Sequence, residues 1–217
     1  MTDRSRPSVS AVELALSMGD ALPWADSITE AELELAAAGR ELLDAIAASS
    51  VDDDARARLA ADIRRVASEL LAGGGRDPIR LVRHPGGWIE NVIQAGTGRL
   101  NARSLRIDYD DDPDSTDVHG SCTLGASAVG PPGRAHGGVV ASILDEALGR
   151  AMTKAGRTGM TVALDVNLKA AVPLGEELEV LGGVASTDGR KTWVEAEIRV
   201  DGATLATGRG LFVASRT

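Results

Sequence analysis

Aromatic residues, cysteine and positive charge are all scarce in this sequence. Phe, Trp and Tyr make up 2% of the 217 residues, so leucine, isoleucine, valine and alanine must form most of the core. The one cysteine, Cys122, cannot form an intramolecular disulfide and supplies no cluster for structural zinc. The formal charge of −9 opposes binding to nucleic acid or to an anionic membrane, because both depend on a basic surface.

Long apolar runs are absent as well. No segment approaches the ~18 apolar residues that a membrane-spanning helix needs. Residues 1–24 contain no apolar run of the length found in signal peptides, so we expect a cytoplasmic protein. The three histidines do not have the spacing of metal ligands, and we therefore expect no metal site.

Two helices are predicted in the first third of the chain. Ser27 and Glu30 have the spacing of a capping box, in which two side chains satisfy backbone N–H groups at the start of a helix. A second helix should begin within residues 50–54, because acidic residues favour a helix N-terminus, and end at the glycines 73–75. The predicted apolar faces consist of Leu33, Leu42, Leu43 and Ile46, and of Leu59, Ile63, Val66 and Leu70.

We divide the chain into a helical extension, residues 1–79, and a domain at residues 80–217. The apolar faces of the two helices are too narrow for an independent domain, so the hairpin must pack on something else, as a structural or oligomerisation element. Residues 80–98 predict a turn and a strand. The acidic segment 108–117 is expected to be a solvated loop or a strand end. It is not expected to bind calcium, because it lacks the central glycine and terminal glutamate of a calcium-binding loop.

The last hundred residues show one helix followed by antiparallel strands. The helix should run from Gly137 to Lys154 and end at Gly156. Asp201 and Gly202 have the composition of a tight turn between the last two strands. This order predicts an α+β fold, because a parallel sheet would alternate strands with helices. The predicted strands are residues 118–126, 161–171, 177–186, 192–200 and 203–214.

The start of this helix, GPPGRAHGG at residues 130–138, is the most informative motif. The first N–H groups of a helix have no internal partner, and the aligned peptide dipoles leave partial positive charge there. Gly137 and Gly138 allow a ligand to approach these groups closely. Such a site can polarise a carbonyl group and stabilise the oxyanion that forms when the carbonyl is attacked.

Two adjacent acids, Asp145 and Glu146, follow about two and a half turns into the helix. On a helical projection both fall at the margins of the apolar face, Asp145 beside Leu148 and Glu146 near Ile143. The residues predicted to form this face are Val140, Ile143, Leu144, Ala147 and Ala151. The periodicity does not choose between them, and both are equally compatible with ordinary solvated charges.

Together these motifs resemble the hotdog-fold thioesterases of the PaaI-like group, and most closely the acyl-CoA thioesterases of the THEM type. The resemblance covers roughly the last hundred residues. It implies an antiparallel sheet wrapped around one long helix, and a homodimer whose sheets join edge to edge, with a tetramer left open. The matching segments are GPPGRAHGG, VVASILDEALG, TVALDVNLKAAVPLG and GRKTWVEAEIRVDGATLATGRGLF.

The resemblance also implies an acyl-CoA thioesterase whose active sites are shared between two subunits. Asp145, nine positions after His136, matches the nucleophile or general base of the family. Gly137 matches the residue whose N–H polarises the thioester carbonyl, and Gly138 is expected to contact the substrate. His136 would orient the turn or contact the thioester. Thr161 matches a residue that the family places near the carboxylate and its water.

For the nucleotide end of CoA, the resemblance indicates Lys191, with Arg190 beside it. Lys169 and Arg134 are further basic candidates, although such charges are more often only part of the surface. No cofactor is expected, since CoA is part of the substrate. Residues 128–135 lack the Asn or Gln that many PaaI-like enzymes carry before the glycines, so the group that positions the water is not identified.

Other functions remain open. A non-catalytic acyl-thioester binder, acting as a sensor or scaffold, would keep the pocket without turnover. A hotdog dehydratase needs an Asp and a His working as a pair, and Asp145 has no suitably spaced histidine. A Ser-His-Asp hydrolase is disfavoured because no G-x-S-x-G motif is present. The acyl group, whether fatty or aryl, does not follow from the sequence.

Overall fold

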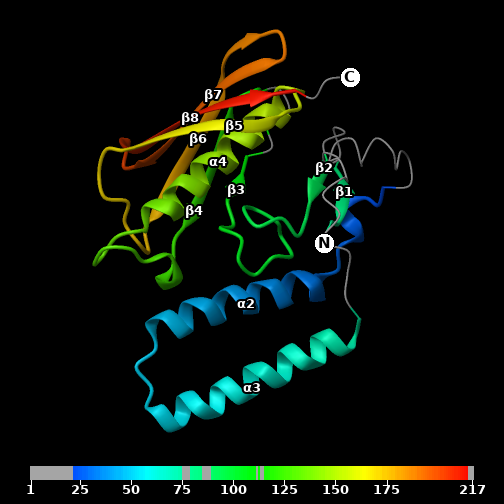
Figure 1. Cartoon of the computed structure of the whole chain (residues 1–217), viewed down its shortest axis with the longest axis vertical. Helices are drawn as coiled ribbons and strands as arrows, with labels where there is room; N and C mark the ends of the chain where they lie inside the picture. The colour runs from blue at the N-terminus through cyan, green and yellow to red at the C-terminus, as the bar shows by residue number, and fades with distance from the viewer. Residues whose placement is uncertain (1–21, 75–78, 85–88, 111, 113–114, 215–217) are drawn as a thin grey trace, which may run out of the picture.

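The computed structural model describes residues 22–74, 79–84, 89–110, 112 and 115–214. In this part of the chain one long helix, α4 (Gly137–Lys154), lies across a six-stranded antiparallel sheet (Figure 1). This is the α+β hotdog arrangement that the sequence predicted. The strands are β3 (Asp108–Tyr109), β4 (Val118–Thr123), β5 (Met160–Leu168), β6 (Glu177–Asp188), β7 (Lys191–Val200) and β8 (Ala203–Val213), in the spatial order β3-β4-β6-β7-β8-β5.

The main hydrophobic core forms where α4 packs on the sheet. Burial alternates along β7, because successive side chains of a strand point to opposite faces and only one face meets the helix. Leu148 and Met152 of α4 are buried in addition to the predicted face, so the apolar face is wider than predicted. The predicted residues that are buried are Val140, Ile143, Leu144, Ala147 and Ala151.

The bounds predicted for α4 are confirmed, and those of the five longer strands agree with the structure within three residues. Asp201 and Gly202 both have positive φ, 50° and 76°, as a tight hairpin turn between right-twisted strands requires. Residues 108–117 were expected to form an acidic loop or a strand end, and their first two residues are the strand β3. Asp108 and Tyr109 pair with β4, because the Tyr109 ring packs against the main core.

The two predicted N-terminal helices are present as α2 (Glu30–Ala48) and α3 (Asp53–Ala72), but the predicted cap of the first was wrong. Thr29, and not Ser27, is the N-cap, and it forms the capping box with Glu32. Ser27 lies instead in a 3-10 turn, η2 (Ala25–Ser27). The reason is that the next residue, Ile28, is buried in a small core, and the helix begins only beyond it.

This small core joins the N-terminal helices to the segment that follows them. β1 (Leu81–Arg83) and β2 (Ile89–Asn91) form a two-stranded antiparallel sheet. Val82 and Val92 pack there with Ile28 and with Leu33 of α2. The turn predicted after β1 lies mostly outside the described residues. The domain boundary at residue 79 stays a prediction, since this core takes residues from both sides of it.

Helix α3 lies farthest from the sheet, on the other side of α2 (Figure 1). In the described part of the chain it buries none of its own side chains, and Leu59, Val66 and Leu70 are 44–52% exposed. None of the helices described here has the length and apolarity of a membrane span.

Replacing Thr29 tests the corrected cap. We expect Thr29→Ala to lower the free energy of unfolding by roughly 0.5–2 kcal/mol, because an N–H group at the start of α2 loses its acceptor. The exposed Ser27→Ala is the matched control and should leave stability unchanged. Urea unfolding followed by circular dichroism measures both. An equal effect of the two substitutions would contradict this assignment.

Candidate active site

The N-terminus of α4 is capped by the side chain that precedes it. His136 has an extended backbone, and its Nδ1 accepts a hydrogen bond of 3.0 Å from the N–H of Gly138. The N–H of Gly137 has no hydrogen-bond acceptor among the described residues, as expected at the first position of a helix. The structure therefore brings the three predicted residues together, but the open donor is Gly137 and not Gly138.

A short turn delivers the chain to His136. The 3-10 turn η3 (Ala126–Ala128) comes first, and the chain then folds back so that the His136 N–H donates to the Ala128 carbonyl at 2.9 Å. A Cβ atom at Gly130 would lie 2.6 Å from the His136 Cα, so this close approach requires glycine. The geometry of the helix N-terminus thus depends on the position of η3.

Asp145 lies on the side of α4 that faces β5. Its carboxylate is partly buried, and Oδ1 accepts a hydrogen bond of 3.4 Å from Thr161 Oγ1. These two predicted residues come from different elements and meet at the boundary between core and solvent. A carboxylate in that position can hold a water molecule or a proton.

The carboxylate of Glu146, the adjacent acid, is held by a loop at residues 94–97, which we call the clamp and which sequence reasoning missed. Its Oε2 accepts hydrogen bonds from Gln94 Nε2 at 2.9 Å and from Thr97 Oγ1 at 3.2 Å. A Cβ atom at Gly96 would lie 1.6 Å from Oε1, so the loop backbone rests directly against the carboxylate. Burial raises the pKa of the Glu146 carboxyl despite these bonds, and the nearby Asp145 charge raises it further. The two acids therefore have different environments.

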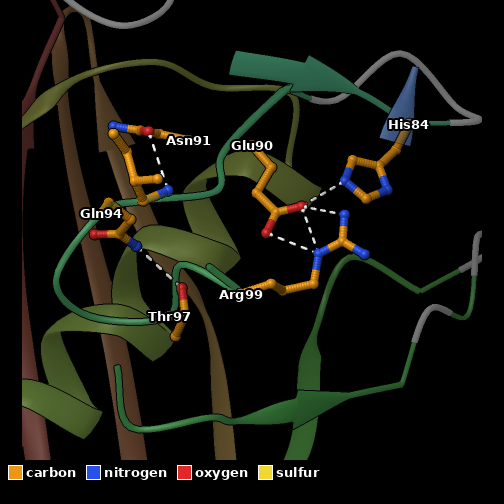
Figure 2. A network of polar contacts seen from close by, with 7 residues as sticks. His84, Glu90, Asn91, Gln94, Thr97 and Arg99 are labelled. Carbon is orange, nitrogen blue, oxygen red and sulfur yellow. Dashed lines mark hydrogen bonds and ion pairs between the residues drawn. The ribbon is translucent and has the colours of Figure 1, made fainter. Parts of the chain in front are cut away.

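The loop that holds Glu146 is stiffened by its own polar network. Figure 2 shows the Glu90 carboxylate between His84 and Arg99, with hydrogen bonds of 2.7 Å to His84 Nε2 and 3.0 Å to Arg99 Nη2. In the same view, Gln94 Nε2 donates a hydrogen bond of 3.0 Å to Thr97 Oγ1. Burial lowers the pKa of His84 although Glu90 opposes this shift.

The predicted basic residues lie at two ends of the sheet. Arg190 and Lys191 are exposed at the turn between β6 and β7, near the end of β5 that carries Thr161. Arg157, which the sequence analysis did not single out, lies at this same end and donates to Thr192 Oγ1 at 2.8 Å.

The other two basic candidates lie at the opposite end of β5. Lys169 directly follows β5, and Arg134 forms an isolated bridge with Pro173. Within the chain, these two residues and the pair at the β6–β7 turn do not form one cluster.

Gly137 and Asp145 are also separated within the chain. They are eight residues apart on α4, which corresponds to about 12 Å along the helix axis at ~1.5 Å per residue. Strand β5 contacts α4 at both positions. Its Thr161 contacts Asp145, and its Leu168 side chain lies against Gly137, where an added Cβ would be 3.1 Å from Leu168 Cδ1.

The remaining reactive side chains of the described residues do not form a second centre. Cys122 is buried in β4, and burial raises the pKa of its thiol to about 12, so it is a poor nucleophile. His119 is exposed, and its Nδ1 and Nε2 lie 3.1 Å from an Asp110 carboxylate oxygen and 3.0 Å from a Glu179 carboxylate oxygen. Both carboxylates raise the pKa of the ring, and the hydrogen bond to Glu179 raises it most. No group of three or more His, Cys, Asp or Glu side chains in this part of the chain is arranged as a metal site.

The site residues that the sequence analysis missed share one property. Gln94 and Thr97 act on α4 through contacts that span about fifty positions of the sequence. Asp44 of α2 contacts the backbone of Ser127 in η3 across 83 positions. Nothing in the local pattern marks these residues, because their neighbours exist only in the folded chain.

Residues 132–207 match the Thioesterase superfamily. Acyl-coenzyme A thioesterase THEM4 of Bos taurus is 36% identical over 86 residues, which are 39% of this chain and 35% of that protein. The aligned part thus spans about a third of the length of this relative.

Two solved structures are also similar. The thioesterase superfamily protein RHA08564 has a TM-score of 0.76 and 30% sequence identity, covering 88% of this chain and 97% of that one. The PaaI protein of the phenylacetic acid degradation operon of E. coli has a TM-score of 0.47 and 22% identity, covering 51% and 84%.

The clamp on Glu146 gives a prediction about stability and pH. A carboxyl whose pKa is raised on folding contributes stability below its unfolded pKa, and this contribution is lost as pH rises through the folded pKa. Glu146→Gln keeps an acceptor for Gln94 and Thr97 but cannot ionise. We expect the melting temperature of the variant, relative to the wild type, to increase as pH rises from 4 to 8.

Thermal unfolding of both proteins in matched buffers measures this difference. Glu41→Gln, on the exposed face of α2, is the control for the loss of one charge. A difference between the Glu146 variant and the wild type that is constant with pH, or that decreases, would contradict the raised pKa.

Proposed function

This chain belongs to the thioesterase superfamily, and from that premise we propose that it hydrolyses acyl-CoA thioesters with Asp145 and the Gly137 N–H. The observation that supports the proposal most is the open Gly137 donor at a capped helix N-terminus, together with the Thr161-bound carboxylate of Asp145. The similarity to the acyl-coenzyme A thioesterase of Bos taurus supports the substrate class.

In the proposed reaction Asp145 acts as the general base. It takes a proton from a water molecule, whose oxygen attacks the thioester carbonyl carbon. The tetrahedral intermediate then collapses and the carbon–sulfur bond breaks. The protonated Asp145 returns the proton to the departing CoA thiolate, leaving the free acid and CoA. Thr161 orients the carboxylate through its hydroxyl group, which donates to Oδ1.

The N–H of Gly137 stabilises the oxyanion of the intermediate. Its position at the first turn of α4 adds the partial positive charge of the helix N-terminus to the hydrogen bond. Removing one oxyanion donor of this kind typically lowers the rate by ~10²–10³. His136 acts as the cap that fixes this turn and not as the base, because its Nδ1 is occupied by the Gly138 N–H.

Asp145 and Gly137 of a single subunit are too far apart to act on one carbonyl. We propose a homodimer in which strands β5 of two subunits pair in antiparallel orientation. This pairing would place the Thr161 end of one strand, beside Asp145, against the Leu168 end of the other, beside Gly137. The proposal is supported by β5 lying at the edge of the sheet with Met160 and Val162 each 58% exposed.

The anionic nucleotide end of CoA would bind to Arg190 and Lys191. Their position near Thr161 supports this assignment, and Arg157 is a further candidate at the same end of the sheet. An arginine favours phosphate recognition because its planar donors match two phosphate oxygens.

Two adjacent substitutions test the choice of the base. We expect Asp145→Asn to lower kcat at least ~10²-fold, since proton removal from water contributes about that much. Glu146→Gln should retain activity, because that acid is turned into the clamp. Release of free CoA thiol from acyl-CoAs of different chain lengths measures both variants. Undiminished turnover in the Asp145 variant, or loss only in the Glu146 variant, would refute the assignment.

Gly137→Pro tests the oxyanion donor. Proline removes the N–H group and fits the first position of a helix, so α4 should form as before. Gly137→Ala adds a Cβ atom in the same place but keeps the N–H, and it serves as the control. We expect kcat to fall ~10²-fold or more in the proline variant relative to the alanine variant. Equal rates would show that this donor does not act in catalysis.

A further inference from the structure

We infer that Asp44, on helix α2, is a positioning residue. It fixes the position of the Gly137 N–H, the oxyanion donor of α4, and through it the N-terminal helices contribute to the reaction. The inference rests on the proposed role of the Gly137 N–H. Asp44 does not touch the substrate site. It acts through the turn η3, which precedes the start of α4.

The turn η3 has no capping side chain of its own, and Asp44 provides one from α2. The residue before η3 is Gly125, which has an extended backbone and no side chain with which to accept a hydrogen bond. The Asp44 Oδ1 accepts instead from the Ser127 N–H at 2.8 Å. A Cβ atom at Gly125 would lie 2.0 Å from Asp44 Oδ2, so the carboxylate occupies the place of the missing side chain.

The position of η3 is transmitted to the catalytic turn by the backbone. Its last residue, Ala128, is buried, and its carbonyl accepts from the His136 N–H at 2.9 Å. His136 in turn caps α4 at Gly138 and precedes the open donor Gly137. Three hydrogen bonds and one turn of backbone thus connect Asp44 with the oxyanion site.

Helix α2 is itself fixed at the point where Asp44 projects from it. Gly39 packs so closely on residue 102 that a Cβ there would lie 2.7 Å from the Ala102 Cβ. Arg40 Nη1 donates to the Asn101 carbonyl at 3.2 Å. Asp44 is on the same face, one helical turn beyond Arg40. A rigid helix therefore presents the carboxylate to η3, and the cap does not depend on a mobile side chain alone.

A double substitution separates this role from a general effect on stability. Asp44→Ala removes the cap and leaves space beside Gly125. Gly125→Ser by itself places a side chain where the Asp44 carboxylate lies, and it should also disturb the turn. Combined, the two substitutions give η3 an N-cap serine of its own in the vacated space. We expect the double variant to be more active than either single variant.

The measured quantities are kcat and KM for acyl-CoA hydrolysis, at a temperature where circular dichroism shows every variant folded. Misplacement of the oxyanion donor should lower kcat in Asp44→Ala by about tenfold or more and change KM less, because the donor acts mainly in the transition state. Asp44→Asn keeps an acceptor oxygen and should restore most of the rate. Glu41→Ala, exposed on the same helix, should match the wild type.

The outcomes distinguish this inference from the proposed function. A wild-type protein without hydrolytic activity on any acyl-CoA would remove the proposed function itself. An active wild type with an equally active Asp44→Ala variant would overturn only the positioning role. A double variant no better than the two single variants would also overturn it, as would equal losses in Asp44→Asn and Asp44→Ala.

Discussion

The open N-terminus of α4 is the constraint on which the other features of the site depend. A helix must leave its first N–H groups without internal partners. Here His136 accepts from the Gly138 N–H, while the Gly137 N–H has no acceptor among the described residues. That arrangement persists only if the chain enters the helix at a fixed angle. The glycine at 130 and the buried carbonyl of Ala128 set this angle locally. The contacts of α2 and of the loop at residues 94–97 set the surroundings of α4 from a distance.

The two adjacent acids show how packing assigns different roles to similar side chains. Both are partly buried and lie at the edge of the buried face of α4. Glu146 meets a loop from the N-terminal half and becomes a buried hydrogen-bond acceptor with a raised pKa. Asp145 accepts a hydrogen bond from Thr161 of the edge strand β5 and is only partly buried. The clamp therefore holds Glu146 against the loop, and the proposed reaction uses the carboxylate of Asp145.

Local patterns predicted the elements, and long-range contacts decided the details. The bounds of α4 and the turn at Asp201 follow from helix stop signals and turn composition, and both were predicted. The predicted start of α2 was wrong. Ser27 has an equally good capping pattern two residues before Thr29, but the burial of Ile28 outweighed it. The residues expected at the site were chosen by spacing and resemblance. The clamp on Glu146 and the cap from Asp44 could not be found in this way, because their partners lie about 50 and 83 positions away.

The central claim is that each active site combines Asp145 of one subunit with Gly137 of another. Mixing the Asp145→Asn and Gly137→Pro proteins and allowing their subunits to exchange tests it directly. Each mixed dimer would contain one site with both defects and one site with none. With random exchange, half of the dimers are mixed, so the account predicts recovery of about a quarter of the wild-type rate per subunit. A mixture that stays as inactive as its two components, although exchange has occurred, would contradict the claim.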